Sequence, residues 1–187
     1  MSSPEAAALC LLTPVLRALQ TAPPQTVVLI DGPSGAGKST LADALQRAWP
    51  TDTVPTVVRL DDIYPGWGGL DAASGHLGRY VLRPRREGNP ATWQRYDWTT
   101  RQQAEWTPVA ADRPLIVEGC GTLAAAHVPL SDIRVWIGAD DALRKARALS
   151  RDGEMFREHW DQWQQQWVAY CARESPERSA SIRLAAR

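Results

Sequence analysis

One segment, GPSGAGKS at residues 32–39, constrains this chain more than any other part of its sequence. It fits the pattern G-x-x-x-x-G-K-[ST], in which glycines let successive backbone N–H groups of a loop turn inward toward phosphate oxygens. An apolar run at 26–30 precedes the segment, and apolar residues at helical spacing follow over 38–49. The order of strand, glycine-rich turn and helix predicts a phosphate-binding loop, and it disfavours a glycine-rich turn without a ligand.

The side chains of this segment have distinct predicted roles. Lys38 is expected to neutralise the β- and γ-phosphates of ATP, and the Ser39 hydroxyl to meet Mg²⁺. The backbone N–H groups and the start of the following helix would supply the other donors. The residues predicted to bind the nucleotide here are Gly32, Ser34, Gly35, Ala36, Gly37, Lys38, Ser39 and Thr40.

Further buried strands alternate with helices along the chain, which is typical of an α/β protein with a parallel sheet. A length of 187 residues, with 44% apolar and 22% charged residues, suits one globular domain over 1–187. An N-terminal helical segment is expected over 1–25, with one helix or a helix pair at 4–20. The other strands are expected at 56–60, 114–117, 133–137 and 180–184, and the other helices at 140–150 and, as a long polar helix, at 155–173.

The stretch 62–112 is too long for a plain connection between a strand and a helix. We expect one or two helices there, the first beginning near Ser74, and a surface that holds an acceptor substrate. Tryptophans and tyrosines in this stretch suit a flat ligand, although they can equally fill a hydrophobic patch. Arginines at 83, 85 and 86 leave open an acceptor that already carries a phosphate.

Acidic residues follow two of the expected strands, where ligands bind in parallel α/β sheets. Asp61 is expected to take the proton from an attacking hydroxyl and to lie near the metal ion. For its neighbour Asp62, a functional role and a structural role as a helix cap or a solvated group both stay open. Glu118 ends the apolar run LIVE and is expected to help Ser39 hold Mg²⁺, because a buried glutamate without a partner would be costly.

Three arginines recur at three- and four-residue steps after the fourth expected strand. Arg144, Arg147 and Arg151 would share one helix face. We expect a helical lid over 144–153, in which Arg147 and Arg151 act on the transferring phosphoryl group and Arg144 binds the nucleotide. Asp152-Gly153 would serve as its hinge. The alternative is a solvated basic face.

The motifs, taken in order, resemble the uridine kinase and phosphoribulokinase branch of P-loop kinases. The resemblance extends over about residues 26–152 and includes GPSGAGKS, Asp61-Asp62-Ile63-Tyr64, Tyr96-Asp97-Trp98 and Val117-Glu118-Gly119. It implies a three-layer P-loop NTPase fold with a five-stranded parallel sheet in the order 2-3-1-4-5, helices on both faces and a helical lid.

The same resemblance implies the function of a kinase. Such a kinase uses ATP and Mg²⁺ and transfers the γ-phosphoryl group of ATP to a hydroxyl of a nucleoside or similar ribosyl compound. The sequence departs from the family at Asp62, at Trp98 and at 99–101, where the family has Ser, Phe and a basic H-x-R segment. The predicted substrate residues are Asp61, Tyr64, Trp67, Tyr96, Asp97 and Trp98.

Charge and cysteine content narrow the partners. Lysine plus arginine equals aspartate plus glutamate at 21 each, and this balance disfavours a general nucleic-acid binder. The partner that the resemblance implies is a small-molecule acceptor. Three widely spaced cysteines and no membrane-length apolar run favour a cytoplasmic protein. The oligomeric state is not predicted. The rival functions are a P-loop ATPase that uses water and a nucleotide-binding module without an acceptor.

Overall fold

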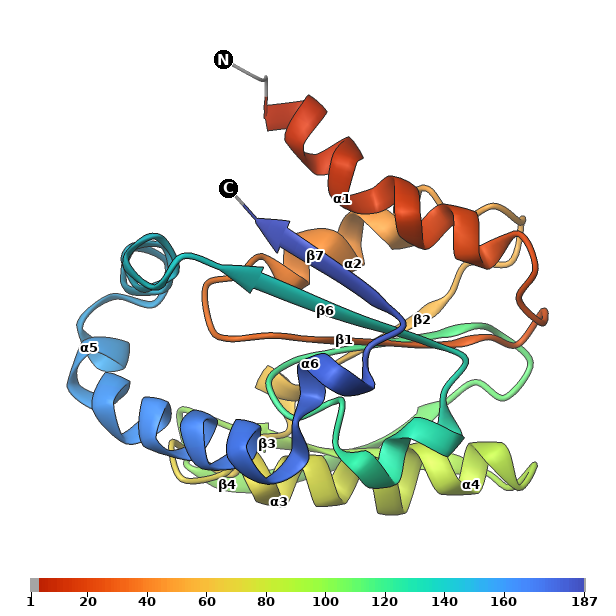
Figure 1. Ribbon diagram of the computed structural model, residues 1–187. Helices are drawn as coiled ribbons and strands as arrows, with labels where there is room; N and C mark the ends of the chain where they lie inside the picture. The colour runs from red at the N-terminus through yellow and green to blue at the C-terminus, as the bar shows by residue number, and fades with distance from the viewer. Residues whose placement is uncertain (1–3, 187) are drawn as a thin grey trace.

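A five-stranded parallel sheet forms the centre of the molecule (Figure 1). The computed structural model describes residues 4–186, apart from the side chains of residues 4–9 and 152, so the ends of the predicted 1–187 domain lie outside it. The strand order is β2-β5-β1-β6-β7, which is 2-3-1-4-5 when these five strands alone are numbered along the chain. The sheet strands are β1 (Val27–Asp31), β2 (Thr56–Arg59), β5 (Leu115–Glu118), β6 (Ile133–Ala139) and β7 (Ile182–Ala186).

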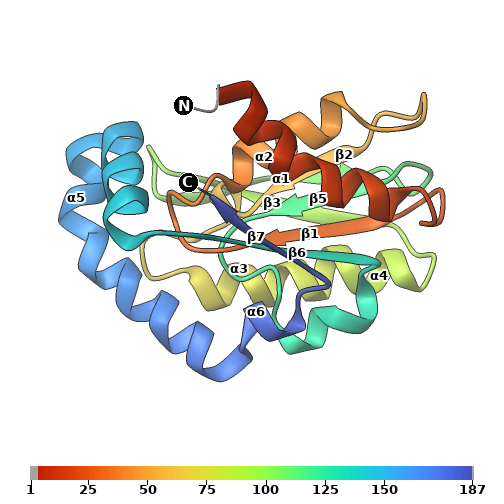
Figure 2. The same ribbon diagram turned by 45° about the horizontal axis from the view of Figure 1, so that its top comes forward.

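Helices cover both faces of this sheet (Figure 2). No helix in the described part of the chain is both long and apolar enough to span a membrane. The helices are α1 (Pro4–Leu19), α2 (Lys38–Arg47), η1 (Leu60–Asp62), α3 (Leu70–His76), η2 (Leu77–Leu82), α4 (Arg83–Arg86), η3 (Ala125–Leu130), α5 (Asp141–Glu174) and α6 (Pro176–Ser179).

Strand β1 shows why the sheet has two buried faces. All five of its residues are buried, and alternate side chains point to opposite sides. Val28 and Ile30 join a core with α1 and α2, whereas Val27 and Leu29 join a larger core with α3, η2 and α5. A continuous apolar strand is what two covering layers of helices require.

The N-terminal segment forms one helix, so the expected alternative of a helix pair is wrong. Helix α1 continues through Pro14, and its described side chains Leu12, Val15 and Leu19 are buried against the sheet. Four leucines at helical spacing, Leu9, Leu12, Leu16 and Leu19, predict this helix; Leu16 is half-buried, and the Leu9 side chain lies outside the described set.

The structure of the 62–112 stretch differs from its prediction in two ways. Its helical part, α3 followed by η2 and α4, begins at Leu70 rather than near Ser74. It then forms an antiparallel hairpin of β3 (Ala91–Asp97) and β4 (Gln102–Val109), which the sequence analysis did not predict. The hairpin strands are mostly half-buried or exposed, so they lack the apolar run by which the strands of the main sheet were recognised.

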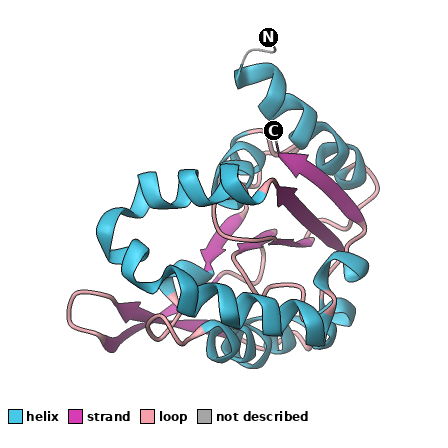
Figure 3. Cartoon of the chain, turned by 60° about the vertical axis from the view of Figure 1, so that its left-hand side comes forward, coloured by secondary structure: helices cyan, strands magenta, loops and turns pink. Residues whose placement is uncertain are grey.

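Helix α5 consists of two limbs that meet at Gly153 and run in different directions (Figure 3). Gly153 has φ 68° and ψ −152°, a conformation that is essentially restricted to glycine. The predicted break at this residue is therefore present. The second limb is mostly exposed, as a polar helix would be, but one face carries a buried aromatic stripe with steps of four and three residues that was not predicted. The stripe consists of Phe156, Trp160, Trp163, Trp167 and Tyr170.

A buried carboxylate joins three parts of the fold. Asp31, at the end of β1, accepts hydrogen bonds from the backbone N–H groups of Gly32 at 2.7 Å, Gly121 at 3.1 Å and Leu123 at 2.8 Å. The Tyr170 hydroxyl of α5 donates to it at 2.9 Å. Burial raises the pKa of Asp31, and these donors act against that rise. The cluster holds together the loop after β1, the segment after β5 and helix α5.

Replacing Tyr170 by phenylalanine should therefore destabilise the fold. The change leaves the buried Asp31 carboxyl with one donor fewer, and we expect a loss of about 1.5–3 kcal/mol in the free energy of unfolding. Urea unfolding would measure it. Tyr80→Phe is the matched control, since Tyr80 packs through its ring on His76 and Trp106, and its loss should stay below about 0.5 kcal/mol. Equal small losses in both variants would contradict this role of Asp31.

Candidate active site

The loop between β1 and α2 is closely packed against the first limb of α5. Gly35 has φ +80°, and a Cβ atom there would lie 2.0 Å from the carbonyl oxygen of Arg144. A larger residue is therefore excluded by both the backbone conformation and the contact. The loop leads directly into α2, which begins at Lys38, so the N–H groups of its first turn face the same region.

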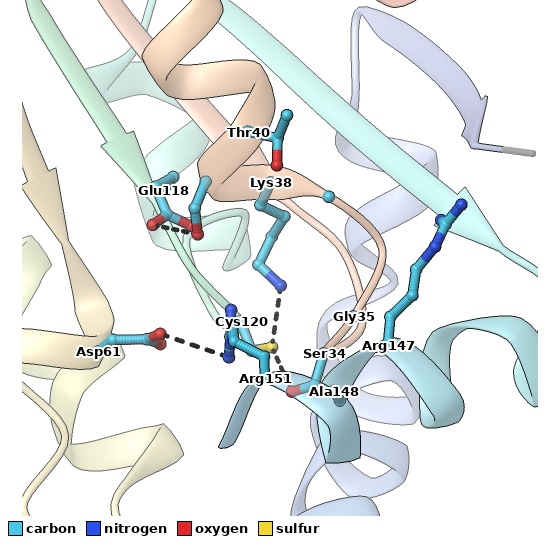
Figure 4. A pocket seen from close by; sticks show the side chains of 12 residues that line it. Ser34, Gly35, Lys38, Thr40, Asp61, Glu118, Cys120, Arg147, Ala148 and Arg151 are labelled. Atoms are coloured by element: carbon cyan, nitrogen blue, oxygen red, sulfur yellow. Dashed lines mark hydrogen bonds and ion pairs between the residues drawn. The ribbon is translucent and has the colours of Figure 1, made fainter. Parts of the chain in front are cut away.

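A cavity of about 210 Å³, which we call the phosphate pocket, lies against this loop (Figure 4). It is at the carboxyl edge of the sheet, where β1, β2 and β5 end. Most of the predicted nucleotide and catalytic residues line it, whereas Gly32, Ala36 and Arg144 do not. The lining residues are Ser34, Gly35, Gly37, Lys38, Ser39, Thr40, Asp61, Glu118, Cys120, Arg147, Ala148 and Arg151.

Lys38 reaches into the interior of the loop. Its Nζ atom donates to the carbonyl oxygen of Pro33 at 3.0 Å and lies 3.5 Å from the Sγ atom of Cys120. Burial acts to lower the pKa of Lys38, but the groups around it, Cys120 and Glu118 foremost, leave that pKa above its ordinary value. The ammonium group therefore keeps its charge at neutral pH.

Ser39 and Glu118 meet as the sequence predicts. The Ser39 hydroxyl donates to Oε1 of Glu118 at 2.9 Å, and the Arg59 guanidinium lies 3.7 Å from the same oxygen. The carboxyl group is buried, and burial raises its pKa, with Asp61 adding to the rise. A cation at this point would stabilise the charged carboxylate.

The donor set at Ser39 and Glu118 fits magnesium. Mg²⁺ prefers oxygen ligands and is commonly held by one or two protein groups, with phosphate oxygens and water completing its shell. The described residues contain no group of three or more His, Cys, Asp or Glu side chains that would hold a metal unaided.

Asp61 occupies a position that Asp62 does not share. Its carboxylate lines the phosphate pocket, and its Oδ2 atom lies 3.9 Å from Nη2 of Arg151. Both side chains remain more than half exposed, at 56% and 54%. Asp62 lines neither of the two cavities described here, and burial and the neighbouring Asp61 raise its pKa. Of the two neighbouring carboxylates, the structure therefore places Asp61 at the phosphate pocket.

The three arginines of the expected lid lie in different surroundings. Arg147 and Arg151 line the phosphate pocket. Arg144, in contrast, is buried. Its guanidinium donates to the Asp141 carboxylate at 2.6 Å and to Oε1 of Gln164 at 2.9 Å. The two limbs of α5 meet at this contact, so the Arg144 side chain joins the limbs and does not line the phosphate pocket.

A second cavity, of about 270 Å³, adjoins the first. We call it the aromatic cavity. Four of the six predicted substrate residues line it, together with three residues of α5 that sequence reasoning missed. Two of those three, Phe156 and Trp163, belong to the aromatic stripe of α5, whose spacing could have revealed them. The lining residues are Ser34, Asp61, Tyr64, Trp67, Trp98, Arg151, Met155, Phe156 and Trp163.

The other two predicted substrate residues, Tyr96 and Asp97, shape the end of the hairpin. The Tyr96 ring packs edge-on against Trp98, with a centroid distance of 5.4 Å. The Asp97 carboxylate accepts from the backbone N–H groups of Thr99 at 2.9 Å and Thr100 at 3.1 Å. Neither Tyr96 nor Asp97 lines a cavity. Tyr96 supports the Trp98 ring, and Asp97 stabilises the turn.

Cys120 lies at the bottom of the phosphate pocket. Its thiol is buried and donates to the carbonyl oxygen of Gly32 at 3.3 Å. Burial raises its pKa. A thiol with these properties stays protonated at neutral pH and is a poor nucleophile.

Comparisons with known proteins identify the fold. No protein-family model and no curated protein matches the sequence. Among solved structures, the chain is similar to a possible uridine kinase from Bacillus stearothermophilus, with a TM-score of 0.66, 18% identity, and coverage of 92% of this chain and 96% of that one. It is also similar to a proposed fructose transport system kinase from Silicibacter sp. TM1040, with a TM-score of 0.53, 21% identity, and coverage of 95% and 97%.

The chain therefore has the fold of uridine kinase-like P-loop kinases. This fold agrees with the resemblance that the motifs carry. At these identities the likeness concerns the fold, and the substrates follow from the site itself.

Proposed function

We propose that this protein is a kinase that transfers the γ-phosphoryl group of Mg-ATP to a hydroxyl group of a small molecule. The observation that carries the proposal is the position of Asp61, which lines both the phosphate pocket and the aromatic cavity. A phosphate held on the loop and an acceptor held in the aromatic cavity would meet at this carboxylate. Ser34 and Arg151 are the other residues common to both cavities.

The loop side would bind the phosphates. Lys38 supplies a positive charge inside the loop, and the N–H groups at the start of α2 supply donors for phosphate oxygens. Ser39 and Glu118 would hold Mg²⁺ through oxygen atoms. When bound, the ion would neutralise charge on the β- and γ-phosphates.

Asp61 would act on the acceptor. It would accept the proton of the acceptor hydroxyl as the acceptor oxygen bonds to the γ-phosphorus. The bond between that phosphorus and the β–γ bridging oxygen breaks, and ADP leaves with the bond's electron pair. Arg151, 3.9 Å from the Asp61 carboxylate, would stabilise the negative charge on the group in transit.

Initial rates of ADP release would test this proposal. The protein would be assayed with ATP and Mg²⁺ alone and then with a nucleoside, a sugar, pantothenate or ribulose phosphate. Release that depends on an added acceptor supports a kinase. Release that is independent of every acceptor would instead indicate an ATPase, and binding without release would indicate a nucleotide-binding module.

The first limb of α5 gives a separate prediction. If Arg147 and Arg151 cover the transferring phosphoryl group, alanine at either position should lower kcat by at least about tenfold and change ATP affinity less. Steady-state kinetics would measure both. Arg157→Ala is the control, because Arg157 is exposed on the second limb and pairs with Glu154 at 3.2 Å. Hydrogen exchange over 144–153 that stays unchanged with ATP and acceptor would argue against a lid.

A further inference from the structure

The aromatic cavity has walls from three separate parts of the chain. Tyr64 and Trp67 come from the loop after β2, Trp98 from the end of the hairpin, and Phe156 and Trp163 from the second limb of α5. Its volume of about 270 Å³ is at the lower end of ordinary ligand sites. A ligand of one or two rings is therefore the size that it suits.

The polar atoms of three of these rings are already bonded within the protein. The Tyr64 hydroxyl donates to the carbonyl oxygen of Cys120 at 2.9 Å. The Trp98 indole N–H donates to the carbonyl oxygen of Asp61, also at 2.9 Å. The Trp163 indole N–H donates to the Ser34 hydroxyl at 2.9 Å. These rings consequently offer a ligand their carbon faces and edges.

The rest of the wall is similar in character. Trp67 packs on Phe156 with a centroid distance of 5.2 Å and on Trp98 at 4.9 Å, and Met155 adds a flexible thioether. Apart from the Trp67 indole N–H, the described lining offers polar side chains at Ser34, Asp61 and Arg151, the three residues that border the phosphate pocket. The far part of the cavity is apolar, and its polar end is next to the site of phosphoryl transfer.

Arg85 and Arg86, two of the arginines that suggested an acceptor already carrying a phosphate, lie away from the aromatic cavity. Arg85 donates to the carbonyl oxygens of Ala110 and Arg113, and Arg86 pairs with Asp132 at 3.9 Å. Arg113 and Asp132 precede β5 and β6, so this group is at the amino edge of the sheet, opposite the phosphate pocket. An acceptor phosphate in the aromatic cavity would therefore find no partner in Arg85 or Arg86.

We infer that the aromatic cavity binds an uncharged aromatic alcohol whose hydroxyl points to Asp61. The inference rests on the proposed function and narrows its acceptor class. A nucleoside base carries several donors and acceptors at its edge, and burying them beside rings whose polar atoms are occupied is unfavourable. A benzylic or indolic alcohol places a flat apolar ring in the cavity and its one polar group at the carboxylate.

Acceptor specificity tests the inference. At saturating Mg-ATP, kcat/KM should be about tenfold or more higher for benzyl alcohol, naphthalenemethanol or tryptophol than for uridine, ribose or a ribose phosphate. Calorimetric titration with naphthalenemethanol would measure binding without turnover. A preference for uridine or a ribose phosphate would overturn the inference, and so would the absence of both binding and turnover with the aromatic alcohols.

A charge placed in the cavity wall sharpens the test. Met155 lines the cavity and is 62% exposed, so Met155→Glu should fold and raise KM for the aromatic alcohol about tenfold while KM for ATP stays unchanged. Val168→Glu is the matched control on the same limb, at 64% exposure, and should change neither constant. Equal effects of the two substitutions would also contradict the inference.

The two proposals can fail separately. In one outcome, no alcohol supports ADP release, but naphthalenemethanol still binds and Met155→Glu weakens that binding about tenfold. This result would contradict the kinase reaction and support the ligand class proposed for the cavity. If ADP release depends on an acceptor but only nucleosides or sugar phosphates serve, the kinase reaction is supported and the aromatic acceptor is excluded.

Discussion

Asp61→Asn should lower kcat by about a hundred- to ten-thousandfold while leaving ATP affinity nearly unchanged. The asparagine side chain keeps the size of the aspartate but cannot take the acceptor proton, and general-base catalysis contributes a factor of this size. Binding should survive because Asp61 acts in the transition state and not on the bound nucleotide. Steady-state kinetics with a productive acceptor, together with calorimetric titration of ATP, would separate the two quantities.

Asp62→Asn is the matched control for this experiment. Asp62 is the adjacent carboxylate and lines neither cavity, so its replacement should reduce kcat only slightly. The Asp61–Arg151 pair is largely exposed, so its loss should cost little stability in the Asp61 variant. An active Asp61 variant beside an inactive Asp62 variant would contradict the assignment and show that Asp62 is the base.

Lys38→Ala should weaken ATP binding by about ten- to a hundredfold. Lys38 holds a charge inside the loop, and a hydrogen bond from a charged donor contributes about 1.5–3 kcal/mol. The rate should fall further, by about a hundred- to a thousandfold, if the same charge stabilises the phosphoryl group in transit. Titration calorimetry and ADP-release kinetics would measure the two effects.

The only other lysine of the chain provides the control. Lys145 lies over the Trp160 ring on the first limb of α5, with Nζ 5.3 Å from the ring centroid. Lys145→Ala should leave ATP affinity close to that of the unaltered protein. Both variants should retain the circular dichroism spectrum of the fold. Unaltered affinity in Lys38→Ala would contradict the assignment of the phosphate-binding loop.

The phosphate side of the site could be predicted closely from the sequence. Its residues at 32–40 are contiguous, and a buried strand on one side and a helix on the other determine their geometry. The pairing of Ser39 with Glu118 was also predictable, because neighbouring parallel strands β1 and β5 end at the same edge of the sheet. Asp31 was missed, since nothing in a single aspartate after a strand indicates that four donors will surround it.

The acceptor side was predicted only in part. Tyr64, Trp67 and Trp98 were chosen correctly as neighbours of Asp61, although whether they bind a substrate stays a prediction. Tyr96 and Asp97 were chosen with Trp98 because they are adjacent in sequence. In the folded chain, however, the Tyr96 ring packs edge-on against Trp98 and does not line the cavity, and the turn uses the Asp97 carboxylate for its own N–H groups.

Local sequence determined the parallel α/β class, the glycine-rich loop between β1 and α2 and the break at Gly153, because each depends on the conformational preferences of neighbouring residues. Only the tertiary structure decided which rings enclose the aromatic cavity and which polar atoms within it are already bonded. Trp163 meets Ser34 across 129 positions of the chain, and Trp98 meets Asp61 across 37. Such contacts arise when the hairpin and the second limb of α5 pack on the sheet, and their geometry is set by packing between distant segments rather than by local preference.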